Sequence, residues 1–434
     1  FICLTTLNGQ VDYTSQIQTI FTNNCTSCHM YGNASGGLTL TSYSGVMAGG
    51  NSGAVIVAND HANSLLWQKV NTGEMPQNNP ALPQSQIDLI ALWINEGALE
   101  FPAIVQKTYV PDDNFEQALI DLGYDDVLDD SVPTANISGV TTLNVSNDSI
   151  SNLTGIEDFI ALTELDCSQN QLTNLDMSNN TALNILYCNI NQLTGLNVSS
   201  NTALWTLYCY DNQLTSLDVS NNISLSNFDG SSNQLTSLNV SQNIALLILS
   251  VQNNQLDSLD VSSNTALSVL RFSHNQLTVI DVSSNTALTN LDCFANQLDS
   301  LDVSTNTVLT SLGCSYNDLT VLDVSTNTAL TNLNCSGNEL TALDVSNNTA
   351  LLWLYCGWNG LTAVDMSNNT SLRLLTFNSN DLTSLDVSNN TELTTLDCSD
   401  NELTYLNMRN GITDALTTFD ATDNTSLTCI ETLD

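Results

Sequence analysis

The stretch LTELDCSQNQLTNLDMSNNTA, residues 162–182, decides the fold of most of this chain. The same pattern recurs every 21 residues, with further copies that begin at 183, at 204 and so on to 393. The twelve copies contain no insertion or deletion and share the unit L-x-x-L-x-C-x-x-N-x-L-T-x-L-D-V-S-x-N-T-A. A single unit cannot bury its own leucines, so we expect neighbouring units to stack into one continuous core.

A fixed period in the twenties with the pattern L-x-x-L-x-L/C-x-x-N predicts a leucine-rich repeat. We expect a right-handed, β-rich leucine-rich-repeat solenoid over residues 137–430, with degenerate end copies at 143–153 and 416–427. The repeats resemble those of internalin-like bacterial surface proteins, of the 21-residue type that carries a cysteine, and similar secreted proteins of Bacteroidetes. This resemblance covers about residues 108–430 and implies that the repeats bind or adhere.

Position six of the unit is predicted to be apolar core. It holds cysteine in eight of the twelve copies: Cys167, Cys188, Cys209, Cys293, Cys314, Cys335, Cys356 and Cys398. The other copies hold Gly230, Val251, Phe272 and Phe377. Rungs about 4.8 Å apart are close enough for disulfides, but the uninterrupted runs of three, four and one cysteines could not pair completely. We therefore expect buried thiols that act as small hydrophobic side chains.

Two polar positions also repeat. Position nine is Asn in all twelve copies, from Asn170 to Asn401, and is expected to form an internal ladder of bonds to turn backbone. Aspartate alternates with apolar residues in the second half of the unit, at Asp176, Asp218, Asp260, Asp281, Asp302, Asp323, Asp344, Asp365 and Asp386. Alternation points these carboxylates away from the core. Hydrogen bonds to Ser and Thr, bound calcium, or solvation with salt screening are the alternatives for offsetting their repulsion.

Exposed aromatic residues near the expected strands form two clusters. One holds Tyr187, Tyr208 and Tyr210, and the other holds Trp353, Tyr355 and Trp358. Rigid amphipathic rings on a concave face are typical of recognition surfaces, so a protein or glycan ligand is expected there. The alternative is scattered surface aromatics, which need no explanation. Arg271 and His274 share one central repeat and give a weaker indication of binding.

A different motif, Cys25-Thr26-Ser27-Cys28-His29, stands near the start of the chain. The pattern C-x-x-C-H attaches haem c, because two thiols add to the vinyl groups and the adjacent imidazole reaches the iron. A structural zinc site needs four ligands, and no second Cys/His pair lies nearby. A thioredoxin-like pair would need a βαβ context, and a plain disulfide leaves His29 unexplained. We expect one haem c, held by Cys25 and Cys28 and ligated by His29.

Residues 10–105 are predicted to form a small all-α cytochrome c domain. Tyr13, Ile17, Ile20 and Phe21 have helical spacing, and a second helix is expected over 85–96, with Ser85 and Asp88 as a capping pair and Gly97 at its end. The region resembles the single-haem cytochrome domains of secreted planctomycete and Bacteroidetes proteins in residues 25–29, 64–66, 73–76 and the helix with Trp93 and Ile94.

This resemblance implies that Met75 is the second axial ligand of the iron. A thioether opposite imidazole raises the reduction potential and suits electron transfer. His61, in a polar loop, is the rival ligand. Candidates for packing against the macrocycle, or for an ordinary small core, are Phe21, Leu65, Leu66, Trp67 and Trp93.

Charge and the chain's first residues bear on location and partners. The chain has 45 acidic and five basic residues, a net charge of −40, so nucleic acid is excluded as a partner.

Residues 1–9 resemble the tail of a secretory signal peptide with cleavage before Gln10, the alternative being a first strand. No apolar run is long enough to predict a membrane span. Residues 106–136 are expected to be a linker and helical N-terminal cap, with Phe115, Ala118, Leu119 and Leu122 on its helix.

The sequence therefore predicts a two-part protein that is secreted, periplasmic or at the cell surface. Its function is expected to be one-electron transfer to a redox partner protein, with the repeats docking the cytochrome to a protein or glycan. The alternatives are an adhesin or binding scaffold with an accessory haem domain, and a haem sensor, which would need an open axial position. A hydrolytic enzyme is not expected, because the repeats leave no inserted loop for catalytic residues and the chain has only three His.

Overall fold

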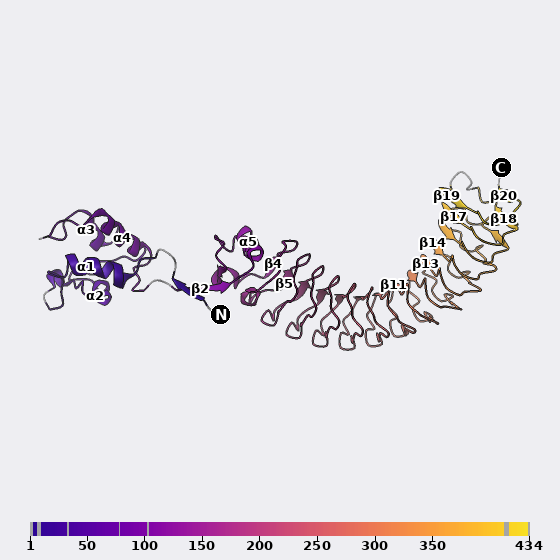
Figure 1. Ribbon diagram of the computed structural model, residues 1–434, viewed down its shortest axis with the longest axis horizontal. Coiled ribbons are helices and arrows are strands. Elements are labelled where there is room, and N and C mark those ends of the chain that lie inside the picture. The colour runs from indigo at the N-terminus through magenta and orange to yellow at the C-terminus, as the bar shows by residue number, and fades with distance from the viewer. Residues whose placement is uncertain are drawn as a thin grey trace. The chain divides into compact units, whose positions relative to one another are not determined.

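The computed structural model describes residues 3–6, 10–32, 34–77, 79–101, 104–411 and 416–432 (Figure 1). Contacts divide the chain into two compact units. Unit 1 contains residues 1–109 with 133–135, and unit 2 contains residues 110–132 with 136–434. Among the described residues, no helix has the length and apolar character that a membrane span requires.

Unit 1 is built mainly from short helices. They are η1 (Tyr13–Ile17), α1 (Gln18–Asn24), η2 (Ser35–Gly37), α2 (Tyr43–Ala48), α3 (Leu65–Asn71) and α4 (Gln84–Asn95). Their shared core includes Ile17, Phe21, Ile90, Trp93 and Ile94, all at most 1% exposed. Two strands, β1 (Cys3–Thr6) and β2 (Ile104–Tyr109), pair in antiparallel register. The expected signal-peptide tail thus includes strand β1, and Phe1, Ile2 and residues 7–9 lie outside the described part.

Helix α4 agrees with the predicted 85–96 helix to within one residue at each end, but its start is capped differently. Its N-cap is Pro83, which has no side chain that can accept a hydrogen bond, so the expected capping pair of Ser85 and Asp88 is wrong. Asp88 instead accepts a hydrogen bond from the Gln84 side-chain amide, at 2.8 Å. At the other end Gly97, with φ of 96°, takes the left-handed conformation that stops a helix.

The first part of unit 2 covers the end of the repeat core. It contains α5 (Asp113–Asp121), β3 (Ser131–Pro133), which runs into unit 1, and α6 (Thr134–Ile137). Asp112 caps α5 by accepting from the backbone N–H groups of Asn114 and Phe115. Phe115 and Leu119 are fully buried at the start of the repeat core, but Leu122 is exposed because α5 has ended before it.

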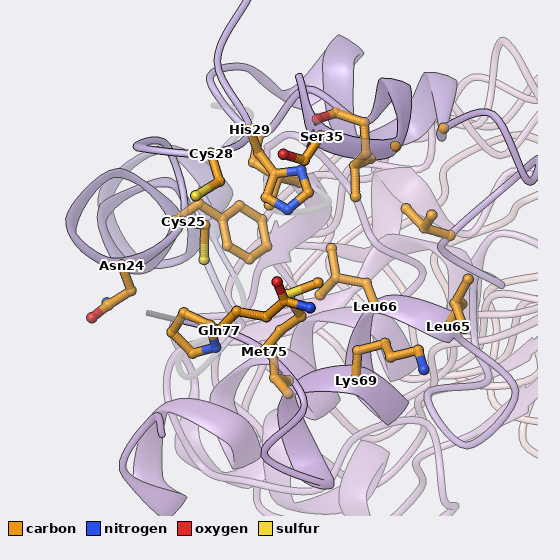
Figure 2. Close-up of a pocket in the computed structure, with 18 of the residues that line it drawn as sticks. Asn24, Cys25, Cys28, His29, Ser35, Leu65, Leu66, Lys69, Met75 and Gln77 are labelled. Atoms are coloured by element: carbon orange, nitrogen blue, oxygen red, sulfur yellow. Dashed lines mark hydrogen bonds between the residues drawn. The ribbon is translucent and has the colours of Figure 1, made fainter. Parts of the chain in front are cut away.

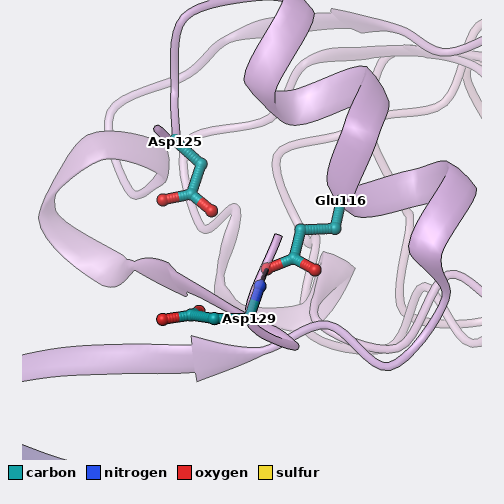
Figure 3. A group of neighbouring side chains, drawn as sticks. All are labelled: Glu116, Asp125 and Asp129. Atoms are coloured by element: carbon teal, nitrogen blue, oxygen red, sulfur yellow. Dashed lines mark hydrogen bonds between the residues drawn. The ribbon is translucent and has the colours of Figure 1, made fainter. Parts of the chain in front are cut away.

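A buried carboxylate holds this cap together. Glu116 is 0% exposed and accepts three backbone N–H bonds, from Asp129, Asp130 and Ser131, at 2.9–3.0 Å. Figure 3 shows Glu116 reaching from α5 toward Asp129, with Asp125 close by. Carboxylate oxygens of these three acidic residues lie within 4.8 Å of one another. Since the Glu116 oxygens are occupied by backbone donors, we assign it a structural role.

The repeats form a leucine-rich-repeat solenoid, with one three-residue strand per rung on the inner side of a curved ribbon (Figure 1). The strands are β4 (Thr142–Asn144), β5 (Glu164–Asp166), β6 (Ile185–Tyr187), β7 (Thr206–Tyr208), β8 (Asn227–Asp229), β9 (Ile248–Ser250), β10 (Val269–Arg271), β11 (Asn290–Asp292), β12 (Ser311–Gly313), β13 (Asn332–Asn334), β14 (Trp353–Tyr355), β15 (Leu374–Thr376), β17 (Thr395–Asp397) and β19 (Thr418–Asp420). They make one parallel sheet of 14 strands in which equivalent repeat positions face each other. A turn, η3 (Ile156–Asp158), precedes the regular repeats. A second parallel sheet, β16 (Ser384–Asp386), β18 (Tyr405–Met408) and β20 (Ile430–Thr432), forms near the C-terminal end.

The prediction of buried thiols is confirmed. All eight position-six cysteines are free and 0% exposed, and burial raises the pKa of each of them. The exception at Gly230 has a packing reason. Its repeat has Phe228 where the others have leucine, and a β-carbon on Gly230 would lie 3.0 Å from the Phe228 ring. The larger ring therefore fills the space that cysteine fills elsewhere.

Two asparagine ladders run through the solenoid, of which the sequence predicted one. The position-nine ladder is confirmed: Asn212, for example, donates to the carbonyls of Cys188 and Cys209 and accepts from the N–H of Leu193. The second ladder is position nineteen, from Asn180 to Asn390, where each side chain is 0% exposed and donates to two carbonyls. Asparagine at this position in eleven of the twelve copies was the available signal.

The repeated aspartates cap turns. Asp302 accepts from the N–H of Ser304 at 2.9 Å, and its equivalents from Asp176 to Asp386 make the same bond. Hydrogen bonding from the side chain and the backbone of Ser304 lowers the pKa of Asp302 despite the coulombic effect of Asp281 and Asp323. Hydrogen bonding is thus the alternative that the structure favours. Among described residues, the acidic group with metal-ligand spacing lies in the cap rather than in this row.

Position eight of every repeat is left-handed, which the sequence did not predict. Its φ lies between 51° and 64°, although this position holds Ile190, His274, Tyr316 and Trp358 as well as one glycine, Gly337. Left-handed backbone costs a non-glycine residue about 1–2 kcal/mol, and Asn tolerates it best. A β-branched residue such as Ile190 is therefore strained there.

We expect Ile190→Asn to relieve this strain. Its matched control is Ile223→Asn, because Ile223 is also an exposed isoleucine, 60% against 41%, and its φ is not positive. Urea denaturation should give Ile190→Asn the higher free energy of unfolding of the two, by about 1–2 kcal/mol. Equal stabilities of the two variants would mean that the solenoid does not strain Ile190.

Candidate functional site

The Cys-x-x-Cys-His motif forms a helical turn directly after α1. The N–H of Cys25 donates to the carbonyl of Phe21 at 2.8 Å, and the N–H of His29 donates to Cys25 at 3.1 Å. Cys25, Cys28 and His29 therefore reach the wall of one pocket (Figure 2). Both thiols are free.

A backbone carbonyl fixes the state of the imidazole. Nδ1 of His29 lies 3.0 Å from the carbonyl oxygen of Leu38, which can only accept a hydrogen bond. Nδ1 therefore carries the proton, and Nε2 has the free lone pair that a metal ligand needs. The same loop is held by a bond from the N–H of Leu40 to the His29 carbonyl, at 2.8 Å.

The pocket has a volume of about 410 Å³ and a largely apolar lining. Of the five residues predicted to pack against a macrocycle, Phe21, Leu65 and Leu66 line it. Trp93 is core, with its indole N–H bonded to the Leu99 carbonyl at 2.8 Å, and Trp67 packs against His61 with ring centroids 4.5 Å apart. Further apolar lining residues are Leu38, Leu40, Val55 and Val70, which sequence spacing did not single out.

Met75 also lines the pocket, and Figure 2 shows it and His29 on different sides of the same space. Its N–H donates to the carbonyl of Lys69 at 3.1 Å, and Lys69 forms an ion pair with Glu74. His61 is not among the lining residues. Nδ1 of His61 lies 2.9 Å from the side-chain oxygen of Asn95, which holds the ring away from the pocket.

The chemistry of the Cys25 thiol argues against a redox-active pair. Burial raises the pKa of Cys25 to about 11, so this thiol is protonated at neutral pH. A redox-active pair uses a thiolate, which a lowered thiol pKa favours. A tautomer-fixed histidine, two free thiols, a methionine and an apolar pocket form a donor set that fits haem c.

The structure brings together part of the predicted aromatic surface. Tyr187 on β6 and Tyr208 on β7 are in contact, with ring centroids 5.2 Å apart, and Tyr210 follows β7. Trp353 and Tyr355 are the two outward positions of β14. Trp358 lies in the turn beyond that strand, at φ of 57°.

The fold and the site define a leucine-rich-repeat protein that carries a Cys-x-x-Cys-His domain. The family model described as planctomycete cytochrome C matches residues 25–78, which include the motif and Met75. A second family model, the LVIVD repeat, matches residues 352–377, within the solenoid.

The solenoid is similar to the functional domain of internalin J from Listeria monocytogenes, whose structure includes a cysteine ladder. The two are 35% identical over 76% of this chain and 77% of that one, with a TM-score of 0.69. This chain therefore belongs to the internalin family through its repeats. A local match to internalin J of serotype 4b (strain F2365) is 38% identical over 73 residues, which is only 8% of that protein. The internalin InlF of the same species shares the fold, with a TM-score of 0.63 at 24% identity.

Proposed function

We propose that this protein is an exported c-type cytochrome that transfers single electrons and that its internalin-like solenoid docks it to a partner. The observation that carries the first half is the hydrogen bond from Nδ1 of His29 to the Leu38 carbonyl, which leaves Nε2 free toward the pocket. Haem c, when bound, supplies an iron centre that gains and loses one electron.

Different residues of the chain would have different roles in a haem site. Cys25 and Cys28 would attach the haem covalently, and His29 and Met75 would hold its iron. Phe21, Leu65 and Leu66 exclude water, and a dry, low-dielectric pocket is one of the levers that set a haem potential. The proposal includes no enzymatic turnover, in keeping with relatives that are internalins.

The test is the absorption spectrum of the full chain produced with haem-c maturation machinery, oxidised and reduced. We expect a low-spin spectrum in the wild type. Met75→Ala should open the iron to external ligands such as cyanide and lower the reduction potential, because imidazole–thioether ligation raises it. His61→Ala is the control and should leave both properties nearly unchanged, since Asn95 holds His61 outside the pocket.

The reverse pattern, with His61→Ala opening the iron, would assign the axial role to His61. A colourless folded protein would refute electron transfer altogether. A haem sensor would instead bind external ligands already in the wild type.

The second candidate function is a surface adhesin or binding scaffold in which the haem domain is accessory. Membership of the solenoid in the internalin family favours it, as does the concave strand face with Tyr187 and Tyr208 in contact. Partner binding that survives loss of haem would support the scaffold, whereas a measured redox partner would support electron transfer. Both functions fit a periplasmic, secreted or cell-surface location, because the repeats resemble those of bacterial surface proteins.

A further inference from the structure

A notch interrupts the row of side chains along the strand face of the solenoid. Position five of five successive repeats holds Arg271, Asp292, Gly313, Asn334 and Tyr355, paired rung by rung in register. At Gly313 the row has no side chain, and a cavity of about 530 Å³ opens there, lined by all five residues. The lining residues come from the segment that runs from β10 to β14, of which Figure 1 labels β11, β13 and β14.

The backbone does not require glycine at position 313. Gly313 lies within strand β12 and is not among the glycines with a left-handed φ. The other eleven regular repeats carry a side chain at this position. A β-carbon on Gly313 would lie 3.2 Å from Oδ1 of Asp292, a tight contact. Glycine therefore keeps this space open and leaves the Asp292 carboxylate undisturbed.

The positively charged side chain of Arg271 lies at one end of the notch. Arg271 is half-buried, and its guanidinium has no hydrogen bond or ion pair with any residue that the structure describes. The neighbouring Asp292 is already engaged, because its oxygens accept from the Phe294 N–H and from Nε2 of Gln252, both at 3.2 Å. An arginine fork binds carboxylates in two-pronged geometry. Although the chain has 45 acidic and five basic residues, this guanidinium is unpaired among the described residues and can bind an anionic group of a ligand.

The walls of the notch offer paired donors and acceptors. Asn290, Asn332 and Asn334 line it, and each side-chain amide has both a donor and an acceptor. Oδ1 of Asn332 is buried without a hydrogen-bond partner among the described residues. A hydrogen bond from a ligand donor to this oxygen would therefore contribute favourably to the binding free energy. Asn332 and Asn334 lie two residues apart on β13, and Asn290 lies two rungs away on β11. Side-chain amides can bond the hydroxyls of a sugar, which both donate and accept.

An aromatic ring of fixed orientation completes the site. Phe294 lines the notch and is held edge-to-face between His274, at 4.7 Å, and Tyr316, at 5.4 Å between centroids. Both supporting residues occupy the left-handed position eight, and Tyr316 is held there against its own backbone preference. An aromatic face offers apolar contact to the C–H groups of a sugar ring.

We propose that this notch binds a sugar residue that carries a carboxylate, within a glycan, with the carboxylate on Arg271 and the hydroxyls on the three asparagines. The inference rests on the proposed role of the solenoid as the recognition part and names the ligand class of that part. A peptide that added a strand is disfavoured, because β10 to β14 are paired on both sides within the sheet.

The test uses the full chain and two pairs of probes: sialyllactose against lactose, and trigalacturonate against maltotriose. Calorimetry or an NMR titration should show that at least one acidic probe binds more tightly than its neutral counterpart. Arg271→Gln should weaken acidic-probe binding about tenfold or more and remove the acidic preference. Gly313→Val, which fills the notch with a strand-compatible side chain, should weaken all sugar binding by a similar factor.

Arg373→Gln is the matched control, because Arg373 is an exposed arginine of the solenoid outside the notch. Binding unchanged in Arg271→Gln would overturn the inference even if Gly313→Val failed to fold. Loss of binding in Tyr187→Ala/Tyr208→Ala but not in Arg271→Gln would overturn the notch and leave the solenoid's recognition role intact. Binding of an acidic peptide, but of neither acidic sugar, would show that the ligand class is wrong.

Discussion

The double variant Cys25→Ala/Cys28→Ala should lose essentially all covalently attached haem. Both thiols are free and lie on the pocket wall beside His29, and thioether bonds to these two sulfurs are the covalent link that the motif provides. After denaturing electrophoresis of protein made with haem-c maturation machinery, wild type should stain for haem and the double variant should not. Each single variant should keep one thioether and so retain part of the stain.

Cys429→Ala is the control for this experiment. Cys429 is a free and exposed cysteine that belongs to unit 2, whereas the motif belongs to unit 1. Its replacement should leave the haem stain at the wild-type level. Haem that still migrated with the denatured double variant would show that the attachment site lies elsewhere, and stain lost in Cys429→Ala would point to a general effect of cysteine loss.

Asn275→Ala should be among the most destabilising single changes in the solenoid. Asn275 is buried; it donates to the carbonyls of Val251 and Phe272 at 2.9 Å and accepts from the N–H of Leu256 at 3.0 Å. Alanine leaves these buried groups without partners, and each unsatisfied group costs about 1–3 kcal/mol. We expect a loss of about 3 kcal/mol in the free energy of unfolding, measured by urea denaturation.

The second asparagine ladder provides the comparison. Asn264 donates to two carbonyls, but its own Oδ1 is buried without a partner among the described residues, so alanine also removes an unsatisfied oxygen. Asn264→Ala should therefore cost less than Asn275→Ala. Gln276→Ala, an exposed neighbour, should change stability by less than about 0.5 kcal/mol. An equal cost at Asn275 and Asn264 would contradict the assignment of the ladder bonds.

Periodicity explains why the solenoid could be predicted so fully. Each rung has the same sequence pattern and the same packing neighbours, so one unit of 21 residues predicts the strands, the buried cysteines and the position-nine ladder. The left-handed turn at position eight escaped prediction because its usual signals, Gly and Asn, occur there in only two repeats, Gly337 and Asn253. The residue at which α5 ends was not predicted either: Leu122 fits the helical pattern, but the helix ends at Asp121.

Local spacing along the chain was enough to predict the repeat fold, the division into two parts and the Cys-x-x-Cys-His motif. Features that depend on residues distant in the chain became visible only in the folded structure. It placed the Leu38 carbonyl against His29, put Met75 in the pocket and His61 outside it, and set Trp358 in the turn beyond β14. It also showed that Gly313 opens a notch, since the residues that surround it come from five separate repeats and meet only when the rungs stack.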